Sequence, residues 1–294
     1  MTLEPPVASP RTLAEAYSLL ESSSAEAQLR PVAGSTDLLV QITGELAPPP
    51  IACLDLWRLD ELRGIAVKPA ALVLGALTTF AEIRHSALCR ELAPALAEAA
   101  ATVGAAQIQN RATIGGNIAN ASPAGDSLPV LLAMDAVIEI GGPRGERSVP
   151  AVAMWPAYRT TALAPDELIL RIRLPLVPGR EACFRKVGTR RAQAISKVVL
   201  CLSWRDEPDA TALGPRVWRD VRLALGSVAP TPIRATATER VLEGLRPTPE
   251  TADRAAEALA REIAPIDDIR STADYRRAVA ARVLHRLIRE AGDW

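Results

Sequence analysis

The chain has 294 residues, with 34 basic and 34 acidic side chains and therefore no formal net charge. Apolar residues make up 49% and charged residues 23%, which predicts a globular protein with a sizeable core and excludes a disordered chain. We expect no nucleic-acid partner, because the sequence has neither a net positive charge nor a stripe of Lys and Arg. We expect no membrane insertion, because no apolar run reaches the roughly 18 residues of a membrane helix.

The N-terminus and the rare residue types narrow the functional classes further. The opening MTLEPPVASPRTL has neither the basic start nor the apolar stretch of a secretory signal, so we expect a cytoplasmic protein. The four cysteines are Cys53, Cys89, Cys183 and Cys201. They form no C-x-x-C pair, and only His85 and His285 add imidazole groups. We therefore predict no metal site and no Ser-His-Asp triad in this chain.

Helical and extended patterns alternate in the first half of the chain. Helices are predicted at Thr12–Glu21, Leu38–Thr43, Thr79–Ser86, Glu91–Val103 and Val130–Met134, and strands at Arg30–Val32, Ile51–Leu56, Gly64–Lys68, Leu72–Gly75 and Ala136–Ile140. The stretch Gln107–Pro129 is dense in Gly, Asn, Ser and Pro and is predicted to be irregular, and Gly141–Gly145 is predicted to turn the preceding strand back.

The second half has a different order, with strands first and helices last. Strands are predicted at Leu168–Leu174, Cys183–Val187, Ala194–Trp204 and Val217–Gly226, and helices at Thr236–Gly244, Thr251–Ile263 and Thr272–Ala291. In the last helix the predicted apolar stripe is Tyr275, Val279, Val283 and Leu287, and the arginines predicted to face solvent or another subunit are Arg276, Arg277, Arg282, Arg286 and Arg289. Strands followed by helices indicate an α+β C-terminal domain, with a boundary near Pro175–Gly179.

The segment Val32–Leu38 joins a predicted strand to a predicted helix and consists largely of small and hydroxyl residues. Gly34 permits close approach of the backbone to a ligand, and Ser35 and Thr36 add hydroxyl donors. Such a loop at a helix N-terminus exposes several backbone N–H groups, which suits a phosphate or a pyrophosphate. An ordinary capped turn explains the residues at least as well.

A second segment, Thr113–Asp126, is long, polar and anchored by apolar residues. Its paired glycines followed by asparagine indicate close approach of the backbone to a ligand, and Asp126 offers a carboxylate for a ribose-type hydroxyl. The competing interpretation is a self-satisfied Ω-loop. Neither segment is a G-x-G-x-x-G or G-x-x-x-x-G-K-S/T motif, so neither a Rossmann site nor a P-loop is predicted.

Taken together, these motifs resemble the FAD-binding medium subunit of the molybdenum hydroxylases, the family of xanthine dehydrogenase and carbon monoxide dehydrogenase. The similar segments are VAGSTDL at 32–38, LGALTTFAEI at 74–83, QIQNRATIGGNI at 107–118, ASPAGDSLP at 121–129, YRTT at 158–161 and FRKVGTR at 184–190. The resemblance implies an α+β chain. It would consist of a vanillyl-alcohol-oxidase-type (PCMH-type) FAD-binding domain at 1–177, with α/β subdomains at about 1–56 and 57–177, and a C-terminal α+β domain at 178–294.

The same resemblance implies which residues bind the cofactor. The pyrophosphate would be wrapped through the backbone N–H groups of Val32, Ala33, Gly34, Ser35, Thr36, Asp37 and Leu38. The second FAD-contacting segment would comprise Thr113, Gly115, Gly116, Asn117 and Asn120, with Asp126 on the sugar hydroxyls and Ile169 and Lys186 approaching the adenine and flavin ends. Relatives often have glycine where Ser35 stands. Tyr158 either covers the flavin ring or packs beneath it.

The implied function is electron transfer through a non-covalent FAD. Molybdopterin and two-iron, two-sulfur clusters would sit on a large and a small partner subunit, in a heterotrimer or a dimer of heterotrimers. No catalytic residue is predicted in this chain, because the cofactor carries the chemistry. A free-standing FAD oxidase of a small alcohol and a non-catalytic FAD-binding scaffold remain alternatives. The hydroxylated substrate and the electron acceptor (NAD+, a quinone, oxygen or another) stay open.

Overall fold

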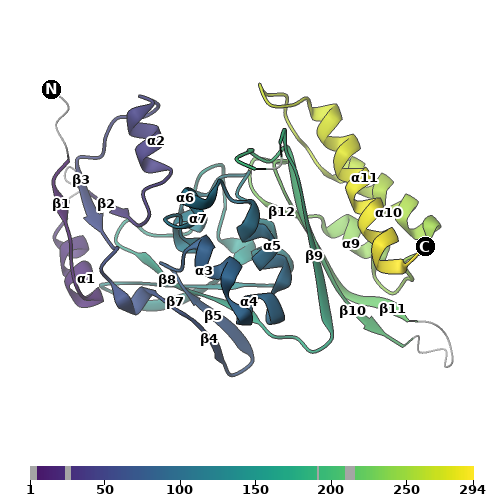
Figure 1. Cartoon of the computed structure of the whole chain (residues 1–294), viewed down its shortest axis with the longest axis horizontal. Helices are drawn as coiled ribbons and strands as arrows, with labels where there is room; N and C mark the ends of the chain where they lie inside the picture. Colours follow the sequence, from purple (N-terminus) through teal and green to yellow (C-terminus); the bar gives the residue numbers. More distant parts are fainter. Residues whose placement is uncertain (1–4, 24–27, 191, 209–215) are drawn as a thin grey trace.

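The computed structural model describes residues 5–23, 28–190, 192–208 and 216–294. In these ranges the strands form three sheets, which follow one another in chain order along the long axis of the molecule (Figure 1). We call the parts built on them the N-terminal unit (β1 to β3), the middle unit (β4 to β8) and the C-terminal unit (β9 to β12).

The N-terminal unit is a small parallel sheet with one packed helix. It contains β1 (Val7–Ala8), α1 (Leu13–Ser22), β2 (Leu29–Val32), α2 (Leu38–Thr43), β3 (Ala52–Asp55) and the 3-10 turn η2 (Asp60–Leu62). Both β1 and β2 pair in parallel with β3. Ala16 and Leu20 of α1 are buried in one cluster with Leu54 of β3 and with Leu168 and Leu170 of a later strand. This shared core fixes the N-terminal unit against the middle unit.

The middle unit is a five-stranded antiparallel sheet with helices packed on it. Its elements are β4 (Ile65–Lys68), β5 (Ala71–Gly75), α3 (Phe80–His85), α4 (Ala87–Leu92), α5 (Pro94–Thr102), α6 (Ala106–Gln109), α7 (Ile114–Asn120), α8 (Leu128–Ala133), β6 (Val137–Gly142), β7 (Gly145–Pro150), the 3-10 turn η3 (Ala151–Ala153) and β8 (Leu168–Pro175). The strand order is β4-β5-β8-β6-β7. Side chains two residues apart share a face of a strand, so the face of β8 that carries Leu168 and Leu170 continues with Ile172 and Leu174 into the middle core.

The C-terminal unit is a four-stranded antiparallel sheet between two layers of helices. It contains β9 (Arg180–Val187), β10 (Val198–Glu207), β11 (Val217–Gly226), β12 (Ile233–Arg234), α9 (Thr236–Leu242), α10 (Pro249–Glu262) and α11 (Ala273–Gly292). Alternation along β10 separates two cores: Val199 and Cys201 belong to the middle core, whereas Leu200 and Leu202 belong to the core under α9 to α11. The sheet therefore joins the C-terminal helices to the middle unit.

The prediction of an irregular stretch at Gln107–Pro129 is wrong. The structure has α6 and α7 there, and α8 begins at Leu128. Thr113 starts α7 as an N-cap, because its hydroxyl accepts a hydrogen bond from the Gly116 N–H at 3.1 Å. Helix propensity does not predict α7, because this short helix contains two glycines and glycine disfavours helix.

Further elements differ from their predictions. The helix Glu91–Val103 is interrupted: α4 ends at Leu92, and Pro94 opens α5, where a residue without an N–H group is tolerated. The predicted turn at Gly141–Gly145 is confirmed as the hairpin between β6 and β7, in which Gly142 pairs with Gly145. Its first two residues belong to β6, and the strand β7 was not predicted.

The last helix also differs in detail from its prediction. Of the predicted stripe, Leu287 is buried and Val279 and Val283 pack partly buried on the core, whereas Tyr275 is 43% exposed. The buried stripe also includes Ala280 and Leu284, which were not predicted. Arg276 is only 4% exposed, which contradicts the prediction that it faces solvent or a partner.

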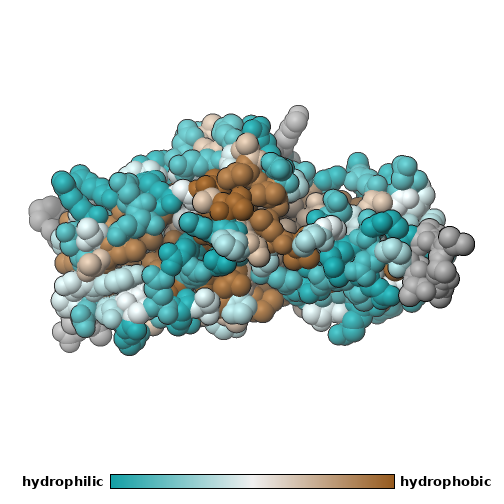
Figure 2. All heavy atoms as spheres, turned by 90° about the horizontal axis from the view of Figure 1, so that it is seen from below, coloured by the Kyte–Doolittle hydropathy of each residue, from teal (hydrophilic) through white to brown (hydrophobic). Residues whose placement is uncertain are grey.

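The surface of the molecule is uneven in polarity. Seen from below, apolar side chains gather near the middle, whereas both ends are mainly hydrophilic (Figure 2). Several apolar residues that pack on the middle core are only partly buried, among them Leu88 and Leu92 of α4 and Leu176 after β8. In the described ranges, no helix combines the length and the hydropathy of a membrane span.

Candidate cofactor site

A single long cleft of about 1540 Å³ touches all three units. Its walls are the β2–α2 loop, α7 with the loop after it, the segment from Tyr158 to Ile169, and residues at the end of β9, before β10 and after β11. Every residue predicted to bind the cofactor lines this one cleft. The volume exceeds the roughly 300–1,000 Å³ of ordinary small-molecule pockets, so the cleft has room for a ligand as long as a dinucleotide.

The β2–α2 loop offers a row of uncommitted backbone donors to the cleft. Among the described residues, none accepts a hydrogen bond from the N–H groups of residues 33–38. Ser35 has a φ of 62°, a left-handed conformation that glycine adopts without strain. Successive N–H groups around a left-handed residue form a concave site for an anion. The loop therefore fits a diphosphate, as the sequence predicts.

Gly34 holds this loop against the segment before α7. A Cβ atom on Gly34 would lie 1.8 Å from the carbonyl oxygen of Arg111, so any side chain would drive the two backbones apart. The Arg111 guanidinium stacks on the Trp57 ring, 3.8 Å from its centroid, and Arg63 lies against the same ring at 4.6 Å. The N-terminal unit and the middle unit thus meet closely at the cleft wall.

The two glycines of α7 have different surroundings. Gly115 is buried and donates its N–H to the Ala76 carbonyl at 2.9 Å, and a Cβ there would lie 2.7 Å from the same oxygen. Packing against Ala76 therefore explains Gly115, and its contact with the cofactor stays a prediction. A Cβ on Gly116 would meet only the Thr113 hydroxyl within 4 Å. Gly116 therefore leaves open space where the cleft runs past α7.

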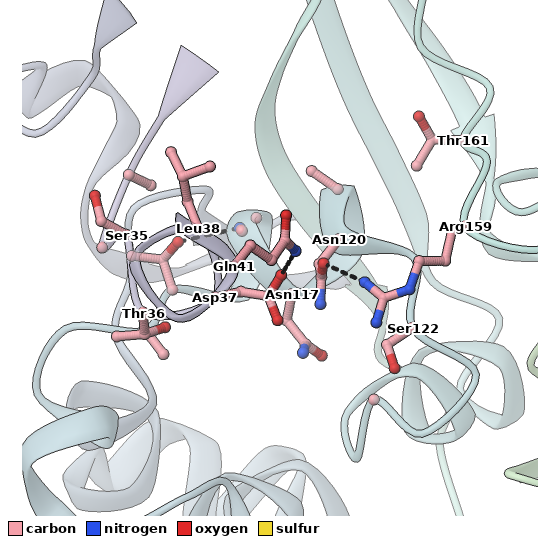
Figure 3. Close-up of a pocket in the computed structure, with 18 of the residues that line it drawn as sticks. Ser35, Thr36, Asp37, Leu38, Gln41, Asn117, Asn120, Ser122, Arg159 and Thr161 are labelled. Carbon is pink, nitrogen blue, oxygen red and sulfur yellow. Dashed lines mark hydrogen bonds between the residues drawn. The ribbon is translucent and has the colours of Figure 1, made fainter. Parts of the chain in front are cut away.

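Asn117 and Asn120 direct their amides into the cleft, facing the hydrogen-bonded pair of Asp37 and Gln41 (Figure 3). The Asn117 Oδ1 accepts a hydrogen bond from the Ser127 hydroxyl at 2.8 Å. The Asn120 Oδ1 accepts one from an Arg159 N–H at 2.9 Å. Both amide oxygens are therefore engaged, which orients each NH2 group as a donor.

Asp126 and Lys186 form a buried ion pair in the cleft wall. The Lys186 Nζ lies 2.5 Å from Asp126 Oδ2, and the hydroxyls of Thr102 and Ser196 donate to the same carboxylate. Burial raises the pKa of Asp126, and the adjacent Lys186 opposes that shift. Internal donors engage both carboxylate oxygens. A hydrogen bond from a sugar hydroxyl to Asp126 therefore stays a prediction, and an Asp126 oxygen would have to accept it beside these internal donors.

Ile169 and Tyr158 differ in how far they are exposed in the cleft wall. Ile169 is 7% exposed and contributes an apolar surface. Tyr158 is 62% exposed at the rim, which favours covering a ligand over packing beneath one.

The sequence analysis missed several residues of this wall. Gln41, Ser122, Arg159 and Thr161 also line the cleft, and Arg159 points at Asn120 (Figure 3). Arg159 and Thr161 belong to the YRTT segment, so the motif match was a signal for them. The cleft also includes Ser196, Ser227 and Arg276 of the C-terminal unit, which no motif indicated.

Comparison with known proteins identifies both parts of the chain. A family model described as the FAD binding domain in molybdopterin dehydrogenase matches residues 3–177, and one described as the CO dehydrogenase flavoprotein C-terminal domain matches residues 183–291. The chain is 32% identical over 286 residues to the carbon monoxide dehydrogenase medium chain of Hydrogenophaga pseudoflava, covering 96% of this chain and 95% of that one. It is 30% identical to the glyceraldehyde dehydrogenase medium chain of Sulfolobus acidocaldarius, covering 91% of each.

A solved structure leads to the same family. One chain of the carbon monoxide dehydrogenase from Hydrogenophaga pseudoflava superposes with a TM-score of 0.90 at 30% identity, covering 97% of this chain and 96% of that one. The predicted fold class is therefore confirmed, and the donor-rich loop and the volume of the cleft fit FAD. The chain belongs to the family of FAD-binding medium subunits of the molybdenum hydroxylases, and it is the flavoprotein subunit of an oxidoreductase.

Proposed function

We propose that this chain holds FAD as the electron-transfer centre of a molybdenum hydroxylase, between iron–sulfur clusters on a small partner subunit and an electron acceptor. The observation that carries the proposal is the cleft, in which all predicted cofactor residues meet beside a loop of uncommitted backbone donors. FAD bound here supplies an isoalloxazine ring that exchanges electrons one or two at a time. The acceptor is NAD+, a quinone, oxygen or another small oxidant.

The chain's own residues bind and orient the cofactor. The N–H groups of residues 33–38 hold the diphosphate, and the amides of Asn117 and Asn120 hold the groups next to it. Asp126 and Lys186 place a fixed pair of opposite charges in the wall near the sugar and flavin ends. Tyr158 covers the exposed side of the ligand. The domain limits remain those proposed from the sequence, 1–177 and 178–294.

The substrate is selected elsewhere in the complex. The two relatives are named for carbon monoxide and for glyceraldehyde, although each aligns with this chain over more than 90% of its length. A medium subunit can therefore keep its fold while the hydroxylated substrate changes. We propose that a large molybdopterin subunit chooses it here.

We propose a cytoplasmic complex with one copy each of the large, medium and small subunits, or a dimer of such heterotrimers. The apolar surface at the middle of the underside (Figure 2) is of the kind that a permanent partner covers. The contact with the small subunit is proposed near Tyr158 and Gly115–Asn120, because electron transfer requires a short distance to the flavin.

The test is to assay the purified full-length chain, loaded with FAD, against purines, aldehydes, N-heterocycles and simple alcohols with an artificial acceptor. We expect no substantial turnover of any of them, while dithionite bleaches the flavin absorbance. Purification from the native host should recover a large molybdenum-containing chain and a small iron–sulfur chain together with this one. Rapid oxidation of any substrate by this chain alone would instead establish a free-standing oxidase.

A further inference from the structure

The cationic side chains of the cleft differ in whether they have a counter-charge. Five of them line it in the ranges that the structure describes: Arg30, Arg159, Lys186, Arg270 and Arg276. Lys186 pairs with Asp126, and both Arg270 and Arg276 pair with Asp268. Among the described residues, no carboxylate lies within 4.0 Å of the other two, Arg30 and Arg159. The cleft therefore holds two arginines that no carboxylate neutralises within this distance, and one carboxylate, Asp37, that has no cationic partner among the described residues.

Arg159 is held in an unusual backbone conformation. It is the third residue of a tight turn, which the Thr160 N–H closes by donating to the Ala157 carbonyl at 3.1 Å. Its φ of 51° is of the kind that this turn position normally reserves for glycine or asparagine. An arginine at this turn position places a guanidinium group at the rim of the cleft, whereas a glycine would have no side chain to offer.

The Arg159 side chain is also oriented. One of its terminal N–H groups donates to Asn120 Oδ1 at 2.9 Å, and Asn120 is the last residue of α7 (Figure 3). The remaining guanidinium donors have no acceptor among the described residues. Arg30 has no such orienting hydrogen bond in that part of the chain. Among the described cations of the cleft, Arg159 is therefore the one that has no counter-charge and whose side chain is oriented by a hydrogen bond.

We propose that Arg159 binds the diphosphate of FAD and that Asn120 is its positioning residue. The proposal rests on the FAD site described above. A diphosphate carries negative charge on several oxygens, and the planar fork of an arginine can donate two hydrogen bonds to adjacent oxygens. The N–H groups of residues 33–38 approach the diphosphate from the N-terminal unit, and Arg159 approaches it from the middle unit.

The test compares ligands that do or do not contain the diphosphate. Full-length chain freed of flavin is titrated with FAD, ADP and riboflavin, for the wild type and for Arg159→Gln. Loss of a charged hydrogen bond should weaken FAD binding by about tenfold or more. ADP should lose affinity by the same factor, and riboflavin should lose none. Arg159→Lys should show a smaller loss, because the charge remains and the fork does not.

Arg282→Gln is the charge-matched control, because Arg282 is exposed on α11 and does not line the cleft. It should bind all three ligands as the wild type does. The proposal would be overturned if Arg159→Gln bound ADP with wild-type affinity. This holds even if the variant bound FAD more weakly, because Arg159 would then act at the flavin ring and not at the diphosphate. Equal losses for riboflavin and ADP would also overturn it. A wild-type chain that fails to bind FAD would instead refute the cofactor site itself.

Discussion

Gly34 and Ser35 are neighbours in the loop proposed to hold the diphosphate, and each limits substitution for a different reason. Gly34 has no room for a side chain, because the Arg111 carbonyl would lie 1.8 Å from its Cβ. Ser35 has a left-handed backbone, with φ at 62°. Adjacent positions of one motif therefore favour glycine for unrelated physical reasons.

We expect Gly34→Ala to weaken FAD binding strongly and to destabilise the fold by about 1–3 kcal/mol, because two backbone segments must separate. Ser35→Gly is the matched comparison in the same loop. It should keep FAD affinity and gain up to about 1 kcal/mol, because glycine adopts the left-handed conformation without strain. Urea unfolding and FAD titration measure both effects. Equal behaviour of the two variants would contradict this account of the loop.

Substitution of Gly116 tests whether the cofactor occupies the open space beside α7. We expect Gly116→Val to abolish FAD binding while leaving most of the fold, because its side chain would extend into the cleft and meet only the Thr113 hydroxyl. Disturbing that N-cap costs about 1 kcal/mol, too little to unfold the chain. Circular dichroism reports the fold, and absorbance near 450 nm reports the flavin. A variant that still carries one flavin per chain would show that the cofactor lies elsewhere.

At the scale of elements, α7 shows what local sequence can and cannot indicate. Thr113 is its N-cap, and the apolar residues Ile114 and Ile118, expected to anchor the segment, are fully buried. The helix itself was missed, because two glycines in its first turn outweigh those signals in any local argument. What stabilises it is tertiary: the Ile114 N–H donates to Thr78, and the Gly115 N–H donates to Ala76.

A charge cluster joins the middle unit to the C-terminal sheet. Asp135, directly after α8, lies 3.5, 3.1 and 3.2 Å from the guanidinium groups of Arg180, Arg222 and Arg234. Arg180 is nearly buried and also pairs with Asp220. These arginines come from β9, β11 and β12, so Asp135 is a common counter-charge for three strands.

We expect Asp135→Asn to destabilise the chain by about 1–2 kcal/mol, because a partly buried counter-charge is lost from three arginines. Asparagine tolerates the left-handed φ of 50° at this position, so the backbone is not the cause. The control is Glu257→Gln, which removes an exposed pair with Arg261 on one helix and should cost under about 0.5 kcal/mol. Denaturant titration distinguishes the two. Equal losses of unfolding free energy in the two variants would mean that the cluster stabilises the chain no more than an ordinary surface ion pair does.

At the scale of the whole molecule, the sequence predicted the cleft from its motifs, but in the wall formed by the C-terminal unit it indicated only Lys186. The loop at 33–38 and the segment at 113–126 are each continuous, so matching to a family finds them. Ser227 and Arg276 reach the cleft only because β10 and β11 pair and α11 packs on the same sheet. Arg276 in particular was predicted to be exposed, because nothing in its helix pattern shows that its guanidinium would reach the carbonyls of Lys197 and Ser227.

A cleft shared by three units makes FAD a cross-link between them, and this gives the last prediction. Binding to the folded state alone stabilises it by about 2.7 kcal/mol when free FAD is a hundred times its Kd. We expect the melting temperature to rise with FAD concentration, and the N-terminal and C-terminal units to melt together when FAD is bound. In the described ranges, no Cys or His lines the cleft to form a covalent link, so acid precipitation should release the flavin into the supernatant. Flavin retained in the pellet, or a melting temperature that ignores added FAD, would contradict a reversible cofactor that bridges the fold.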